Sequence, residues 1–343
     1  MGRINHNLIL GVAALGVGLA VRERLRRNRA IFFPGKVVLI TGGSRGLGLE
    51  LARQLADKGA KLALIARDLD ELERAKYELQ ECGAEVFICP CDLTDERDIA
   101  TAVHAVQDRL GPIDILINNA GIIQVGPLEE MTREDFDDAM KLHFWAPLAT
   151  MQAVLPAMRA RKRGRIVNVA SIGGKISVPH LVPYSASKFA LVGLSQGMRA
   201  ELAADGIYVT TACPGLMRTG SHVNAQFKGQ HTKEYAWFSI ANASPLLSVS
   251  VEEAADQIIH AFKYGDPEII VPVTACMSAF FNGIFPGVVS DVLSLVSRVL
   301  PGPGGIGRGH ASGENSRSHL TPPMLTGLSD DAAVRNNEIG ANA

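Results

Sequence analysis

The stretch that decides the fold is VVLITGGSRGLG, residues 37–48. Its first four residues form a continuous apolar run, as expected for a strand that is buried on both faces of a parallel sheet. A glycine-rich turn follows, and the next apolar residues, Leu49, Leu51, Ala52 and Leu55, recur at helical spacing. The order strand, turn, helix predicts the first unit of an α/β fold.

The glycines of this turn have separate expected tasks. Gly42 permits the tight turn, Gly46 lets the backbone approach a pyrophosphate, and Gly48 lets the helix meet the sheet. The N-terminus of the helix adds free N–H groups and the positive end of its dipole. A turn with a purely structural role is the alternative, but the strand–turn–helix context favours a dinucleotide site.

Strands and helices continue to alternate along the chain. We predict further strands at residues 62–66, 86–89, 113–117, 166–169, 208–212 and 269–271. The intervening helices are expected at residues 68–82, 95–110, 133–161, 184–204 and 251–264. Seven strands with helical crossovers predict a Rossmann-type, doubly wound parallel sheet with helices on both faces, which binds ligands outside the carboxyl ends of its strands.

The end of the second strand indicates which nicotinamide cofactor the turn would hold. A cofactor without a 2′-phosphate usually meets an acidic residue there, which binds the ribose hydroxyl. Ala66 cannot make that bond, whereas Arg67 and Arg45 can flank a phosphate. NADP(H) is therefore favoured over NAD(H), the alternative being that either arginine is only a solvated surface charge.

Three further motifs follow in order: Asn118-Asn119-Ala120-Gly121, Ser171, and Tyr184-Ser185-Ala186-Ser187-Lys188. Together with the glycine turn they resemble the single-domain branch of the short-chain dehydrogenase/reductase superfamily, with its TGxxxGxG and YxxxK motifs. The resemblance runs from about residue 36 to residue 273. The three-residue gap between Gly42 and Gly46 argues against the extended branch of sugar-nucleotide epimerases.

The resemblance implies a set of cofactor-binding residues. Asp92 and Leu93 would lie at the adenine, and Asn118 would help to hold the central strands near the cofactor. The loop from Pro214 to Thr219 would cover the nicotinamide, and Lys188 would bind its ribose. The full expected set is Gly42, Ser44, Arg45, Gly46, Leu47, Gly48, Arg67, Asp92, Leu93, Asn118, Ala120, Gly121, Tyr184, Lys188, Pro214, Gly215 and Thr219.

The spacing of the YxxxK motif indicates its chemistry. Tyr184 and Lys188 are four residues apart and share a helix face. A nearby ammonium, and the positive nicotinamide of the oxidised complex, favour the phenolate, so Tyr184 can exchange a proton with a substrate near neutral pH. Ser171, just past a strand end, can hydrogen-bond a carbonyl oxygen as charge develops. We expect hydride transfer between a carbonyl and an alcohol; the alternative is a surface Tyr–Lys pair and an ordinary strand-end serine.

One residue departs from the family's pattern. The family usually has an asparagine in its long fourth helix, which helps to hold a water that relays protons to the lysine. Here His143 stands at that place. An imidazole can also donate and accept, so the catalytic set would include His143 in a relay with altered pH dependence. Alternatively His143 is a packed residue and the relay is lost, which would suit a rival function: a non-catalytic, membrane-associated protein that binds NADP(H).

The two ends of the chain differ from the middle. Residues 8–21 contain only apolar side chains and glycine, and five arginines follow between residues 22 and 29. We expect a signal anchor that leaves the next domain facing the cytoplasm, with an interfacial or docked helix and a cleaved signal peptide as alternatives. Residues 301–343 hold eight glycines, four prolines and no Phe, Trp or Tyr, so a disordered tail is expected.

These features divide the chain into four parts. An apolar anchor with a basic linker spans 1–35, a Rossmann-fold catalytic domain 36–273, an apolar or amphipathic extension 274–300, and the tail 301–343. Within the domain, the apolar segment 220–247 would bind a lipophilic carbonyl or alcohol, such as a steroid-like or fatty-chain compound. In the extension, residues 288–300 predict an amphipathic helix that caps the pocket, contacts a second subunit, lies on a membrane or packs on the same domain.

Composition and charge exclude several classes of protein. The 34 basic and 35 acidic residues give a net charge of −1, so no nucleic-acid partner is expected. A hydrophobic share of 47% excludes global disorder. The five cysteines are an odd number without the spacing of a disulfide framework or a zinc site, so we expect reduced thiols and no metal. By the resemblance, the helices with His143 and Tyr184 form a subunit interface, which implies a homodimer or homotetramer.

Overall fold

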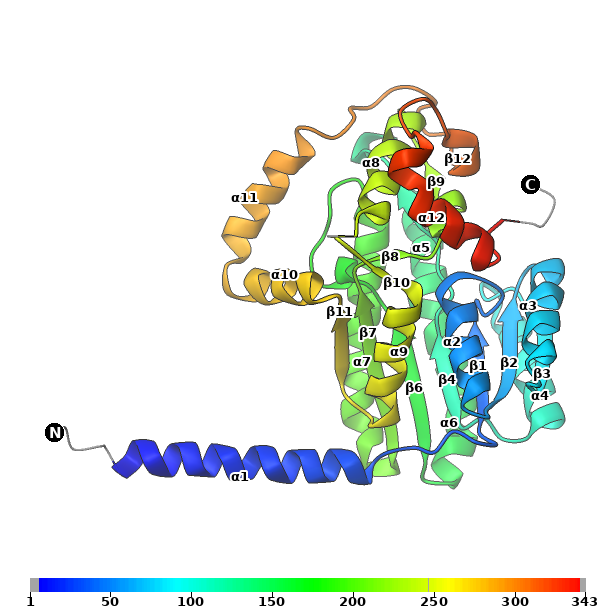
Figure 1. The fold of residues 1–343 in the computed structure, drawn as a ribbon, viewed down its shortest axis with the longest axis vertical. Coiled ribbons are helices and arrows are strands. Elements are labelled where there is room, and N and C mark those ends of the chain that lie inside the picture. Colours follow the sequence, from blue (N-terminus) through cyan, green and yellow to red (C-terminus); the bar gives the residue numbers. More distant parts are fainter. Residues whose placement is uncertain (1–5, 246, 340–343) are drawn as a thin grey trace.

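The computed structural model describes residues 6–245 and 247–339, with side chains from residue 16 onward except those of residues 323 and 325. A seven-stranded sheet forms its centre (Figure 1). The strands lie in the order β3–β2–β1–β4–β6–β7–β11, and every neighbouring pair is parallel. Their bounds are β1 Val37–Thr41, β2 Lys61–Ala66, β3 Val86–Pro90, β4 Ile115–Asn118, β6 Gly164–Val169, β7 Ile207–Pro214 and β11 Glu268–Val271.

Helices cover both faces of this sheet, which confirms the doubly wound Rossmann-type prediction. On one face, α2 (Gly46–Asp57), α3 (Leu69–Glu81) and α9 (Val251–Lys263) share a core with Val38 and Ile40 of β1. On the other, α4 (Glu96–Leu110), α6 (Ala146–Ala160) and α7 (Val182–Leu202) pack with Val37 and Leu39. Successive residues of β1 thus point to opposite cores, which is why its sequence is a continuous apolar run.

The helix expected over residues 133–161 is interrupted. It consists of α5 (Arg133–Met140), one π-helical turn η2 (Lys141–Trp145) and α6. In this turn the N–H of Ala146 bonds to the carbonyl of Lys141, five residues back. Pro147 follows in the first turn of α6 and has no N–H to donate, so the helix can absorb an extra residue here.

The N-terminal helix α1 (His6–Asn28) extends away from the domain (Figure 1). The side chains of residues 6–15, and all of residues 1–5, lie outside the described part, so the anchor prediction is described only in part. From residue 16 onward Val17, Leu19 and Val21 are exposed, whereas Arg26 near the C-terminal end pairs with Asp266 at 2.7 Å. In the described residues, α1 is therefore fastened to the domain at its C-terminal end.

After β11 the chain forms a helical hairpin, α10 (Val273–Ile284) and α11 (Pro286–Ser297), which projects from the domain (Figure 1). Ala275 of α10 is buried against the domain and Asn282 donates to the carbonyl of Lys175 at 3.1 Å, but most of the large apolar side chains of the hairpin are exposed. Within residues 6–245 and 247–339, no single helix has the length and hydropathy to cross a membrane. Taken together, α10 and α11 have that length and hydropathy, although they are bent by 119° relative to each other.

The C-terminal part differs from the disordered tail that its composition predicts. Residues 301–339 return across the carboxyl edge of the sheet and form β12 (Ala311–Ser312) and α12 (Pro323–Arg335). β12 joins β9 (Gln226–Phe227) and β5 (Gln124–Val125) in a small sheet, and α12 contacts α8 (His231–Ala243). Ala332 and Ala333 are fully buried, and the small side chain of Ala333 allows a close approach to the backbone at Gly220.

Two short strands complete the carboxyl edge. β8 (Leu216–Arg218) follows β7 and pairs in parallel with β10 (Ser248–Ser250). The segment between β8 and β10 includes α8 and is the region expected to bind substrate. The pairing of the two strands therefore holds the two ends of this region together.

Candidate active site

The predicted cofactor and catalytic residues all lie at the carboxyl edge of the sheet. They lie at or just after the ends of β1, β2, β3, β4, β6 and β7 or on α7, which starts at the same edge, except His143, which lies in the π turn η2. The strand order reverses between β1 and β4, which is where a doubly wound sheet opens a crevice for a ligand.

The glycine turn has the backbone that the sequence predicts. Gly42 and Gly46 have φ values of +61° and +57°, in the left-handed region that favours glycine. A Cβ at Gly48 would overlap the carbonyl oxygen of Gly42 and lie 2.6 Å from Nδ2 of Asn119. The turn is therefore closed tightly against the start of α2.

A second asparagine, which the sequence analysis did not single out, holds this turn. Asn119 Nδ2 donates to the carbonyls of Thr41 (3.2 Å) and Gly42 (3.0 Å), and its N–H donates to Thr41 Oγ1 at 2.9 Å. Its neighbour Asn118 is buried and donates to Asn168 Oδ1 at 2.9 Å. The doubled asparagine at the end of β4 therefore fixes both the turn and the central strands.

The two arginines expected at a 2′-phosphate differ in their surroundings. Arg45 pairs with Glu71 at 2.7 Å and with Glu338 at 3.4 Å, and Ser44 Oγ donates to Glu71 at 2.9 Å. Arg67 is exposed at the end of β2 and lies close enough to Asp92 to help Thr94 lower the pKa of that carboxyl. Guanidinium, hydroxyl and backbone N–H donors suit a phosphate, so these residues fit an NADP(H) site by chemistry.

Ser171, Tyr184 and Lys188 come together at the end of β6. The backbone of Ser171 is extended, and its Oγ accepts a hydrogen bond from the N–H of Gly173 at 3.0 Å. Lys188 Nζ lies 5.7 Å from the centre of the Tyr184 ring and donates to the carbonyl of Val169 at 2.9 Å. The trio expected from the sequence is thus assembled, although its catalytic role stays a prediction.

Burial shifts the pKa values of Tyr184 and Lys188 in opposite directions. It raises the pKa of Tyr184, and the hydrogen bond with Ser171 opposes that shift. It lowers the pKa of Lys188 to about 7. The lowered tyrosine pKa expected from a nearby ammonium is therefore not found, because loss of hydration raises the pKa of Tyr184.

His143 is fully buried in the π turn. Its Nε2 accepts a hydrogen bond from the N–H of Ile122 at 3.1 Å, so Nδ1 carries the ring proton and donates to Ser187 Oγ at 2.7 Å. Burial and, second, the charge of Lys188 lower the pKa of His143 well below 6.5. The ring is therefore neutral and matches the packed alternative, while a part in a proton relay stays a prediction.

The apolar side chains expected to bind substrate are largely packed among themselves. Phe227, Tyr235 and Phe238 are buried and form a small core with Val125. They therefore stabilise the segment over the site, and their presence alone does not indicate a lipophilic pocket.

Comparison with known proteins agrees with this geometry. The profile of the short chain dehydrogenases matches residues 36–228. A dehydrogenase/reductase SDR family protein 7-like from Anopheles gambiae is 35% identical over 280 residues, 80% of this chain and 87% of that protein.

Two solved structures show the same similarity. A metagenomic short-chain oxidoreductase in complex with NADP is 30% identical with a TM-score of 0.57, over 69% of this chain and 97% of that one. An actinorhodin polyketide ketoreductase variant with NADPH is 32% identical with a TM-score of 0.63, over 71% and 97%. On the motifs, the fold and these relatives, the chain belongs to the short-chain dehydrogenase/reductase family of oxidoreductases.

Proposed function

We propose that this chain is an NADP(H)-dependent oxidoreductase that interconverts a carbonyl and an alcohol. The observation that carries the proposal is the assembly of Ser171, Tyr184 and Lys188 beside a closed glycine turn at one sheet edge. NADP(H), when bound, supplies or accepts the hydride, and the protein provides position and electrostatics.

The side chains divide the remaining work. Tyr184 is a neutral phenol at neutral pH, since burial raises its pKa above the ordinary value of 10.0. It can therefore donate a proton to a substrate oxygen during carbonyl reduction. Ser171 holds that oxygen as charge develops, and Lys188, with a pKa lowered to about 7, is available to return a proton to Tyr184.

NADP(H) is preferred over NAD(H) in this proposal because of the charges beside the turn. Arg45 and Arg67 can flank a 2′-phosphate, and Ala66 supplies no carboxylate for a free ribose hydroxyl. The two solved relatives described above were determined with NADP and NADPH, which supports the same choice.

A lipophilic substrate is suggested by the hairpin beside the site. A Cβ placed on Gly215, in the loop expected over the nicotinamide, would lie 3.0 Å from Cβ of Ala275 in α10. From Val273 to Val299, eleven large apolar side chains are exposed, and the charged residues there are Asp291 and Arg298. An apolar compound reaching the site would thus meet an apolar surface beside it.

The same surface supports attachment to a membrane, with the catalytic domain facing the cytoplasm. Exposed Val17, Leu19 and Val21 of α1 provide a second apolar element, followed by the arginines that favour the cytoplasmic side. Interfacial helices of this kind bind by burying apolar area in the headgroup region.

A homodimer or homotetramer is a further part of the proposal. Trp145 of the π turn and Phe189 of α7 are both exposed, on the helices that the family resemblance assigns to a subunit interface. The solution mass of detergent-extracted protein tests it, and a monomer would contradict it.

The direct test is a panel of carbonyl compounds with NADPH oxidation as the readout. We expect turnover with at least one apolar ketone or aldehyde, and tighter binding of NADPH than of NADH in a titration of both. Losing charge-assisted contacts to a 2′-phosphate should weaken binding by about 1.5–3 kcal/mol each. Tighter binding of NADH, or binding of NADPH without turnover of any compound, would contradict the proposal; the second result would favour the non-catalytic rival.

A further inference from the structure

The last described residues of the chain lie on the glycine turn of the cofactor site. After α12 ends at Arg335, the carbonyl oxygen of Asn336 accepts a hydrogen bond from the N–H of Gly46 at 2.9 Å. Gly46 is the first residue of α2, whose N-cap Arg45 makes no side-chain cap. The chain's own C-terminus thus uses an N–H group that the turn would otherwise offer to a pyrophosphate.

Glu338 places a carboxylate in front of the same turn. Its side chain is 5% exposed, and its Oε2 lies 3.4 Å from Nε of Arg45 and 2.7 Å from Nδ2 of Asn224. A Cβ at Gly46 would lie only 2.6 Å from Oε1. A buried carboxyl that meets an arginine at a helix N-terminus offers acceptor oxygens where a phosphate would also bind.

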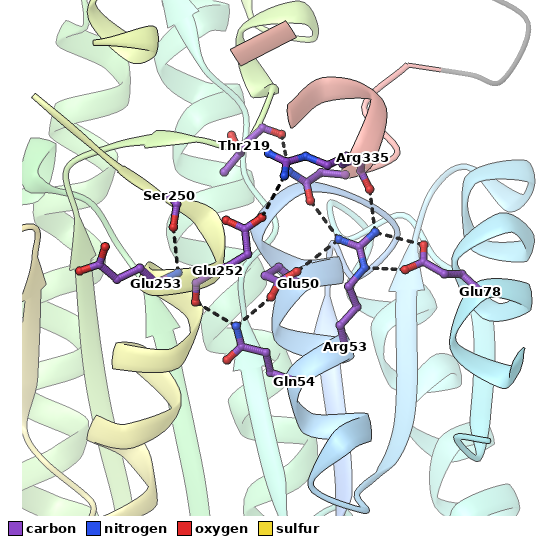
Figure 2. Close-up of polar contacts among 10 residues, drawn as sticks. Glu50, Arg53, Gln54, Glu78, Thr219, Ser250, Glu252, Glu253 and Arg335 are labelled. Carbon is purple, nitrogen blue, oxygen red and sulfur yellow. Dashed lines mark hydrogen bonds and ion pairs between the residues drawn. The ribbon is translucent and has the colours of Figure 1, made fainter. Parts of the chain in front are cut away.

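The segment is also fastened to both walls of the site. Arg53 of α2 donates to the carbonyl of Arg335 at 2.7 Å and to Oδ1 of Asn336 at 3.0 Å, while it pairs with Glu78 (Figure 2). Nδ2 of Asn336 donates to the carbonyl of Thr219 at 3.2 Å. The segment therefore joins the phosphate turn to the loop expected over the nicotinamide.

We propose that residues 335–338 are an internal competitor of the dinucleotide: they dock on the glycine turn and must leave before the cofactor binds. The inference rests on the proposed function, in which this turn holds NADP(H). Only the undocked fraction of the protein is competent to bind, so docking raises the apparent Kd by the inverse of that fraction. A ten-to-one preference for docking would weaken binding about elevenfold.

The contacts of the segment suit a reversible association. Its anchors are hydrogen bonds and ion pairs of Asn336, Asn337 and Glu338. A phosphate can accept from the N–H of Gly46 and from Arg45, and water can donate to the carbonyls of Ser44 and Thr219. No large apolar side chain is buried at residues 335–338. Local opening therefore needs little loss of apolar burial.

The first test compares NADPH affinity in full-length variants by fluorescence titration. Asn336→Ala combined with Glu338→Ala removes the side-chain contacts of both residues and should tighten NADPH binding about tenfold. Val334→Ala is the matched control, because Val334 is 69% exposed at the same end of α12, and its affinity should equal that of the unaltered protein. Unchanged or weaker binding in the double variant would overturn the proposal, since the segment would then lie clear of the cofactor or form part of its site.

A second test needs no substitution. Hydrogen exchange is measured on the unaltered protein with and without NADPH. Protection of residues 42–48 reports cofactor binding, and its absence would contradict the proposed function. If NADPH protects the turn, faster exchange at residues 332–339 with NADPH than without it would support the proposal that this segment competes with the cofactor. Equal or slower exchange there contradicts it and leaves the proposed function standing.

Discussion

At the level of single residues, burial controls the proton chemistry of the site more than charge pairing does. Tyr184 and Lys188 have pKa values shifted in opposite directions, one up and the other down to about 7, and both shifts have loss of hydration as their largest cause. The two neutral forms are thereby favoured together. A phenol that holds its proton beside a lysine near its own midpoint is suited to reducing a carbonyl at neutral pH.

Tyr184→Phe tests this assignment directly. The substitution removes one hydroxyl, so we expect turnover to fall about 100-fold or more, because the proton donor is lost. The Kd for NADPH, measured in the same preparation, should stay within about twofold, since the ring is kept. Near-normal turnover by this variant on an active substrate would show that another group supplies the proton.

A second prediction at this scale concerns Glu338. Burial raises its pKa from 4.5 to about 7, against the opposing charge of Arg45; Glu71 also faces it, and so does the amide of Asn224. The docked segment therefore binds more protons than the released one between these two values, so docking weakens as the pH rises through this window. We expect the apparent affinity for NADPH to increase between about pH 5 and about pH 7 and to level off above that range.

Glu338→Gln is the control for that prediction. The amide does not titrate, so the affinity of this variant should change less with pH than that of the unaltered protein. Ionisation of the cofactor phosphate is common to both proteins, and the difference between the two slopes isolates the carboxyl. Equal slopes would contradict the assignment.

At the level of elements, the π turn is an interruption that the apolar spacing of the sequence does not predict. Apolar residues recur at helical spacing from residue 133 to residue 161, so a single helix is predicted, although Pro147 is a signal of the interruption. The strands were predictable because their apolar runs reflect burial on both faces. Gly42 and Ser171, each just past a strand end, and Tyr184, at the start of a helix, predicted the site, because ligands bind at the carboxyl ends of parallel strands.

The π turn also gives a prediction about stability. Replacing His143 by Ala would leave the N–H of Ile122 and the hydroxyl of Ser187 without their ring partner in a buried place. We expect the free energy of unfolding to fall by about 1–3 kcal/mol, measured in urea. His143→Asn, which retains a donor and an acceptor, should recover part of the loss. Unchanged stability of His143→Ala would show that the ring is dispensable for packing.

The same turn predicts what a pH profile should lack. Because the pKa of His143 lies well below 6.5, its ring stays neutral across the neutral range, and no ionisation of kcat should be assignable to it. A step near pH 6.5 that is present in the unaltered protein and absent in His143→Asn would revive the relay hypothesis.

At the scale of the whole molecule, the C-terminal part shows what composition cannot predict. Residues 301–343 are rich in glycine and proline and contain no Phe, Trp or Tyr, and a disordered tail follows from that criterion. In the described structure Ala333 packs closely against Gly220, and Asn336 and Glu338 form hydrogen bonds with residues far away in the chain. Such contacts depend on the fold of the partner surface, so no local pattern encodes them.

Membrane attachment can be tested by deleting the N-terminal helix, and the contacts of this helix with the domain limit how many residues can be removed. Arg26 pairs with Asp266, and Phe33 is buried against Phe262, so a deletion should stop before them. Removing residues 1–24 should leave NADPH binding unchanged and shift the protein toward the soluble fraction after a salt wash. The shift should be partial, because the exposed α10–α11 hairpin still offers an apolar surface, and one interfacial element gives reversible attachment.

Adding Phe280→Glu and Val292→Glu, both at exposed positions, should release the remaining membrane-bound protein, whereas Asp291→Asn in the same hairpin should not. Full-length protein found wholly in the soluble fraction, with its N-terminus intact, would contradict the anchor.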